Sequence, residues 1–182
     1  MRLIALWVVL GGPLIAALPA GERVVQVAQL YVGHREAAPN RSPLIDYWNR
    51  RLGVPLGSPY CATFVSFCLD SAGVARPRVR AALAIRFNIV GWSRRPDWMR
   101  PTELQRGWIL VWRRGSTWQG HVGIVYKGTR RGVWTIEANT TPGRSTPQRE
   151  REGDGVWKRW REWQRNVFSG NAFRIIAVTP VE

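Results

Sequence analysis

The spacing of apolar and polar positions changes near residue 107. Before that point, apolar residues recur at helical spacing over residues 22–32 and 44–52, and a glycine follows each segment. Ser58-Pro59 then predicts the start of a third helix, which runs to about Ser71. Beyond Gly107 the apolar residues form short β-rich runs between glycine- and arginine-rich turns. The pattern predicts an α+β fold with N-terminal helices packed on a small antiparallel β-sheet.

The predicted strands are short, and four of them follow directly from the pattern: residues 108–112, 121–126, 133–138 and 173–178. Residues 155–161 admit two interpretations, because tryptophans recur every three residues from Trp157 to Trp163. That spacing would suit a helical stripe, but we favour a strand. Residues 78–87 indicate a further helix.

The first twenty residues differ from the rest. A positively charged start is followed by an uncharged apolar run over residues 3–20 that ends in small residues, which is typical of a secretory signal peptide cleaved after Ala17 or Ala20. An apolar run of about 18 residues is also the lower limit for a membrane anchor. We therefore expect residues 1–20 to be a signal peptide or an N-terminal anchor. Residues 21–182 then form one domain that is secreted or lies in the periplasm or cell envelope.

Charge adds an expectation about partners. The formal net charge is +15, and 25 of the 27 basic residues are arginine. Such a field attracts anionic polymers, and beyond a membrane these include peptidoglycan and other anionic cell-wall polymers. A nucleic-acid binder would suit the charge but not the export signal, so we expect no specific nucleic-acid partner. Nothing in the pattern suggests an oligomer, and we expect a monomer.

Candidate chemistry is concentrated at three places. Cys61 falls in the first turn of the third predicted helix, where free backbone N–H groups and the helix dipole favour a thiolate. His121 begins a predicted strand, and Glu137 and Asn139 end the next one. These are the parts of a cysteine nucleophile, its base and an orienting group.

The hairpin register connects the last three residues. If residues 121–126 and 133–138 pair with position numbers that sum to about 258–260, His121 faces Glu137 or Asn139, and the other lies diagonal to it. An odd sum would place both on the opposite face from His121. Either group can fix the imidazole tautomer so that the other ring nitrogen acts as base to Cys61.

The remaining candidates have simpler interpretations. Cys68 lies about 10.5 Å along the helix axis from Cys61, too far for a disulfide, and we expect it to be buried and inert. His34 follows a helix end and is expected to be a loop residue. No cluster has metal-ligand spacing and no phosphate-binding loop is present, so we predict no metal and no cofactor.

These motifs resemble the CHAP family, the cysteine, histidine-dependent amidohydrolases/peptidases, whose papain-like fold is related to that of NlpC-like cell-wall peptidases. Residues 60–69 are similar to the family's cysteine helix, residues 120–125 to its histidine strand, and residues 135–140 to the strand that follows. Residues 31–36 are similar to a segment that precedes the cysteine in bacterial members. The resemblance spans about residues 22–180.

The resemblance implies an exported hydrolase that cleaves an amide bond in peptidoglycan, as an N-acetylmuramoyl-L-alanine amidase or an endopeptidase. It implies that Cys61 is the nucleophile, His121 the base and then the acid, Glu137 the orienting group and Asn139 a supporting polar group. The alternative is a non-catalytic basic, tryptophan-rich module that binds cell wall or surface on the same fold. A groove for sugar rings and anionic polymer could then include Trp92, Trp98 and Trp118.

Overall fold

The computed structural model describes residues 18–142, 153–163, 167–168 and 173–182. Most of the predicted leader, residues 1–17, lies outside this part. Three α-helices come first: α2 (Ala20–Gln29), α3 (Pro43–Arg51) and α4 (Cys61–Ser71). The strands follow: β1 (Ile109–Arg114), β2 (Gly120–Gly128), β3 (Gly132–Thr140), β4 (Gly155–Glu162), β5 (Val167–Phe168) and β6 (Phe173–Thr179). The predicted α+β fold, with helices before an antiparallel sheet, is confirmed.

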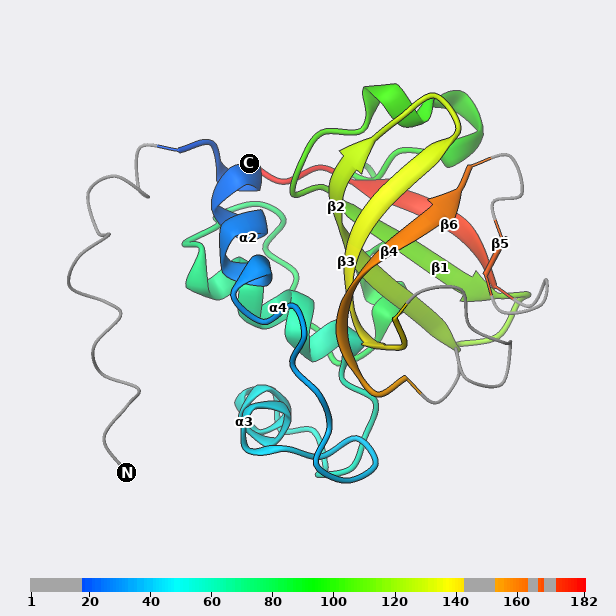
Figure 1. Ribbon diagram of the computed structural model, residues 1–182. Helices are drawn as coiled ribbons and strands as arrows, with labels where there is room; N and C mark the ends of the chain where they lie inside the picture. The colour runs from blue at the N-terminus through cyan, green and yellow to red at the C-terminus, as the bar shows by residue number, and fades with distance from the viewer. Residues whose placement is uncertain (1–17, 143–152, 164–166, 169–172) are drawn as a thin grey trace.

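The sheet has strand order β4-β3-β2-β1-β6-β5, with antiparallel neighbours throughout. Figure 1 shows the three α-helices gathered on one side of this sheet. The strand that we favoured over residues 155–161 is confirmed as β4, which pairs with β3 and extends the sheet beyond the hairpin of β2 and β3. Among the described residues, none of the helices combines the length and the apolar character that a bilayer crossing requires.

Helix α4 occupies the centre of the fold, in contact with β2 and β3 as well as with α2 and α3. Its sequence explains this position, because eight of its eleven residues are buried and the helix is apolar over most of its circumference. Phe64, Val65 and Leu69 are fully buried within the single core. The helix that begins at Cys61 is therefore held from several sides.

Cys68 and His34 lie where the sequence predicts. Cys68 is a free thiol with an exposed fraction of 0%, and burial raises its pKa well above the ordinary value. His34 lies in the connection after α2, where its Nε2 is 2.8 Å from Ser42 Oγ. Ser42 in turn caps α3 by accepting from the N–H of Ile45. Neither Cys68 nor His34 is among the residues that line the cleft at Cys61.

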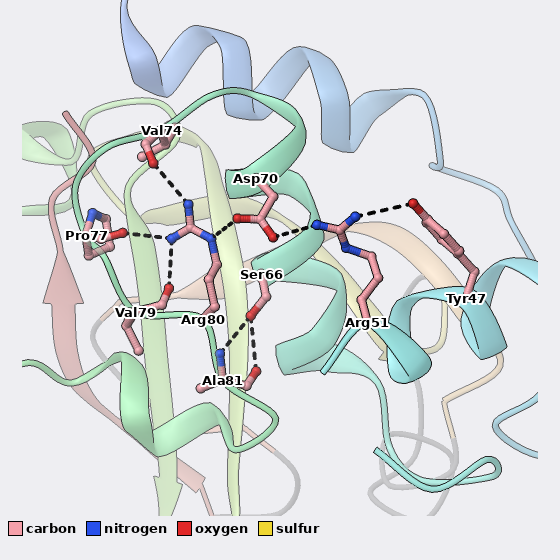
Figure 2. Close-up of polar contacts among 9 residues, drawn as sticks. All are labelled: Tyr47, Arg51, Ser66, Asp70, Val74, Pro77, Val79, Arg80 and Ala81. Atoms are coloured by element: carbon pink, nitrogen blue, oxygen red, sulfur yellow. Dashed lines mark hydrogen bonds and ion pairs between the residues drawn. The ribbon is translucent and has the colours of Figure 1, made fainter. Parts of the chain in front are cut away.

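The predicted helix over residues 78–87 is wrong. This part of the chain forms a single 3₁₀ turn, η1 (Ala84–Phe87), after an extended segment. The physical reason lies in Arg80, whose guanidinium donates to the carbonyls of Val74, Pro77 and Val79 (Figure 2). Together with the bonds between Ser66 and the backbone of Ala81, these side-chain bonds offer the backbone an alternative to helical hydrogen bonds.

Residues 74–83, which we call the 74–83 segment, are fastened to α4 at two points (Figure 2). Ser66 accepts from the N–H of Ala81 at 3.0 Å and donates to its carbonyl at 3.1 Å. Arg80 also pairs with Asp70, which accepts from Arg51 of α3 at 3.0 Å. The position of this segment is thereby fixed relative to the helix that begins at Cys61.

Candidate active site

Cys61 is the first residue of α4 and has an exposed fraction of 7%. It lines a cleft of about 460 Å³, so substrate can approach the thiol. Tyr60, at the N-cap position, makes no side-chain cap to the helix. The first-turn N–H groups and the positive end of the helix dipole therefore act on the space beside the sulfur, where they favour negative charge.

His121 lines the same cleft as Cys61, and the Cys61 side chain is close enough to raise the pKa of the imidazole. Its Nε2 is 2.9 Å from Glu137 Oε2. Since Nε2 is engaged with the carboxylate, Nδ1 is the ring nitrogen left for the thiol. The ring also packs against Trp112, with centroids 5.6 Å apart. The imidazole is thus held at Nε2 and against an aromatic ring.

The hairpin register explains why Glu137 reaches His121. Strands β2 and β3 pair Gly123 with Glu137 and Ile124 with Ile136, so position numbers sum to 260 near the site. This even sum is within the predicted range, and it makes Glu137 the diagonal neighbour of His121. Gly123 stands between them on the same face of the strand. Because glycine has no side chain, the carboxylate can cross this position to the imidazole.

Glu137 has an exposed fraction of 1% and is surrounded by donors. Arg161 of β4 donates from Nε to Oε1 at 2.9 Å and from its terminal nitrogen to Oε2 at 2.5 Å. Thr135 donates to Oε1 as well. Burial by itself raises the pKa of Glu137, but the Arg161 charge and the hydrogen bonds from Arg161 and His121 hold it well below the ordinary value. Glu137 is therefore a carboxylate at neutral pH.

The same groups act on the imidazole. Burial lowers the pKa of His121, but its hydrogen bonds to Cys61 and Glu137 and the negative charge of both partners outweigh that effect and raise the pKa to about 9. The imidazolium is favoured next to two groups that carry, or can carry, negative charge. This arrangement favours the protonated form of His121 beside Cys61.

Asn139 occupies a different place from Glu137. It lines the cleft with Cys61 and His121, in a register shift of β3 where its φ is +56°. Burial raises the pKa of Tyr60, while the nearby backbone of Asn139 acts to lower it. The Tyr60 hydroxyl donates to Glu36 Oε1 at 3.0 Å. Asn139 therefore lies close to the residue before the thiol, while Glu137 contacts the imidazole.

Sequence reasoning missed Arg161 and Gly123. A signal for Arg161 was present, because Trp157, Arg159 and Arg161 share one face of the favoured strand, and a buried carboxylate needs a cation. Gly123 gave no such signal by itself. Gly123 matters because the strand register places Glu137 opposite it, and that register is not read from the glycine itself.

Substitution of Gly123 by alanine is expected to displace Glu137. A Cβ at this position would lie 2.7 Å from Glu137 Cγ and 3.4 Å from Trp112 Cζ3, closer to the first than real contacts allow. We expect the free energy of unfolding to fall by about 1–3 kcal/mol and kcat to fall beyond what any loss of folded protein explains. Thermal melting and kinetics on the same samples measure both. Wild-type kcat would show that the carboxylate does not need its present position.

The cleft itself is lined by apolar and polar groups. Its polar side chains include Ser58, Gln119 and Asn139, and Arg114 provides a positive charge at the wall. Within the described ranges, no three His, Cys, Asp or Glu side chains gather closely enough to hold a metal ion. The reactive groups at the cleft wall and directly behind it are a thiol, an imidazole and a carboxylate.

Comparison with known proteins agrees with this geometry. The family model of the CHAP domain matches residues 53–139. The match includes Cys61, His121, Glu137 and Asn139. No curated protein and no solved structure matches the chain. Residues 53–139 are therefore similar to a CHAP domain, and CHAP domains are in general hydrolases that act on peptidoglycan.

Proposed function

We propose that the protein is an exported cysteine hydrolase that cleaves an amide bond of peptidoglycan, as an amidase or an endopeptidase. The observation that carries the proposal is the placement of Cys61 and His121 at the wall of an open cleft, with Glu137 hydrogen-bonded to the imidazole. In this arrangement the thiol has an adjacent base, and the base has an orienting group. The match to the CHAP domain supplies the substrate class.

Each group has one task in the proposed reaction. The Cys61 thiolate attacks the amide carbonyl carbon, and the negative oxygen that results lies near the first-turn N–H groups of α4. His121 gives its proton to the leaving nitrogen, the C–N bond breaks and a thioester remains. His121 then takes a proton from water, whose oxygen attacks the thioester, and the thiolate leaves. Glu137 stabilises the imidazolium throughout.

Export of the domain is part of the same proposal. The predicted leader, residues 1–20, covers residues 1–17, which lie outside the described residues, and residues 18–20, which end at the first residue of α2. Arg23 donates to the carbonyl of Leu18 at 2.7 Å, and the backbone of Gly21 packs against that of Arg106 and Gly107. Cleavage after Ala17 would leave these contacts in place, so it is the cleavage site that the fold favours over Ala20.

Digestion of purified peptidoglycan tests the function. Wild-type protein should release soluble fragments, and mass spectrometry of the new termini distinguishes an amidase from an endopeptidase. The non-catalytic binding module predicts the opposite: retention of the protein on peptidoglycan with no released fragments. The observation that favours this second candidate is the exposure of Trp118, Trp134 and Trp160, whose rings could contact a wall polymer.

The pH dependence of hydrolysis should show an alkaline limb near pH 9. The pKa of His121 is raised to about 9, so the imidazolium persists through neutral pH and is lost above that value. Because the folded pKa lies above the ordinary 6.5, the protonated ring also stabilises the fold below about pH 6.5, and this contribution is lost as the pH rises toward 9. Profiles of kcat/KM and melting temperature measure both effects. An alkaline limb near the ordinary histidine value would contradict the proposed pairing.

A further inference from the structure

A second hollow adjoins the active-site cleft. It measures about 850 Å³ and shares two lining residues with the cleft, Leu83 and Trp118. Trp118 has an exposed fraction of 68%, so it forms a ridge between the two spaces. A polymer bound across Cys61 can therefore continue over this ridge into the second hollow.

The second hollow carries concentrated positive charge. Arg76, Arg78 and Arg86 line it, and no acidic side chain is among its described lining residues. All three arginines are exposed, and no described residue forms a salt bridge with any of them. Arg76 lies over the ring of Trp92, at 5.7 Å from its centroid. Charge and an aromatic face thus occur together here.

Arg80 differs from the arginines that line the hollow, because its side chain is bonded to other groups of the protein. It belongs to the same segment, but its side chain turns toward α4 and pairs with Asp70 and three carbonyls (Figure 2). Arg80 therefore holds the 74–83 segment, whereas Arg78 and Arg86 line the hollow. Since the segment is fastened to α4, this wall of the hollow is tied to the helix that begins at Cys61.

We propose that this hollow binds a carboxylate-bearing part of the same peptidoglycan strand whose amide bond is cleaved at Cys61. This inference rests on the proposed function. The planar guanidinium groups suit carboxylate oxygens, which accept two parallel hydrogen bonds from one arginine. Continuity with the cleft favours a group on the cleaved strand over a separate phosphate-bearing polymer, because peptidoglycan peptides carry free carboxylates close to their amide bonds. Trp92 and Trp118 supply apolar faces, whereas the side chain of Trp98 lies outside the described ones.

Binding to an inactive full-length protein tests the inference. In the Cys61→Ala background, calorimetry measures Kd for a soluble muropeptide with free carboxylates and for the same muropeptide with its carboxylates amidated. Substitution Arg78→Gln together with Arg86→Gln should weaken binding of the free-carboxylate form about tenfold and leave that of the amidated form unchanged. The matched control, Lys127→Gln with Arg130→Gln, removes the same charge near the β2–β3 turn, at the far end of β2 from His121.

The outcomes separate the hollow from the catalytic proposal. Equal Kd values for the two muropeptides, or an equal loss in the control, would overturn the carboxylate site. Arginine-dependent binding of a glycerol-phosphate polymer without binding of the free-carboxylate muropeptide would overturn it as well. If the wild-type protein digests peptidoglycan but Kd is unchanged by the substitutions of Arg78 and Arg86, the carboxylate site is overturned and the hydrolase proposal stands. If no peptidoglycan is digested but Kd for the free-carboxylate muropeptide still depends on Arg78 and Arg86, the hydrolase proposal is overturned and the carboxylate site stands.

Discussion

Replacement of Cys61 by alanine should lower kcat/KM for peptidoglycan hydrolysis by at least about a thousandfold. The substitution removes the sulfur that forms the thioester, and neither His121 nor Glu137 can replace it as a nucleophile in this cleft. The fold should survive, because alanine fits the first turn of a helix and Cys61 lies at the cleft wall. Release of soluble fragments and a melting curve measure activity and folding in the same preparation.

Cys68 provides the matched control for that substitution. It lies on the same helix and is fully buried, so Cys68→Ala should cost stability through a small cavity but leave kcat close to that of the wild type. Alkylation of the folded protein with iodoacetamide should modify Cys61 alone and abolish hydrolysis in parallel. Persistent hydrolysis by the Cys61→Ala protein, or inactivation that follows alkylation of Cys68, would contradict a nucleophilic Cys61.

Local sequence pattern was sufficient for most of the fold. Helical spacing with glycine ends predicted α2 and α3, and the Ser58-Pro59 signal predicted a helix with Cys61 in its first turn. The prediction failed over residues 78–87, where Ser66 bonds the backbone of Ala81 and Asp70 pairs with Arg80. These contacts reach 15 and 10 residues back along the chain to α4, and local spacing carries no information about them.

The part of the candidate site that lies on the β2–β3 hairpin could be predicted from the pairing of its strands. Matching parity brought Glu137 and Asn139 near His121, but parity alone left open which of them contacts the ring. The structure distinguishes them through two features: the absent side chain of Gly123 and the turn of the backbone at Asn139. The cation that holds Glu137 comes from β4, a strand that the sequence left ambiguous between two periods.

Replacement of Glu137 by glutamine should lower kcat by about a hundredfold. Glutamine keeps the shape of the side chain but removes the charge that favours the imidazolium of His121. The alkaline limb of the pH profile should therefore move down from about 9 toward the ordinary histidine value. Both changes are read from the same set of kinetic profiles. An unshifted limb with wild-type kcat would show that Glu137 is a structural partner of Arg161 alone.

A double-mutant cycle separates catalysis from folding at this pair. Substitution Arg161→Met leaves the Glu137 carboxylate buried with less compensation and should cost about 3–5 kcal/mol of stability. Glu137→Gln together with Arg161→Met removes both charges, so it should recover much of that stability, because neither buried ion then lacks its partner. Unlike stability, kcat should not recover: it should be as low in the double variant as in Glu137→Gln, because His121 lacks its carboxylate partner in both. Recovery of kcat along with stability would instead mean that Glu137 acts on hydrolysis through the fold and not through the imidazole.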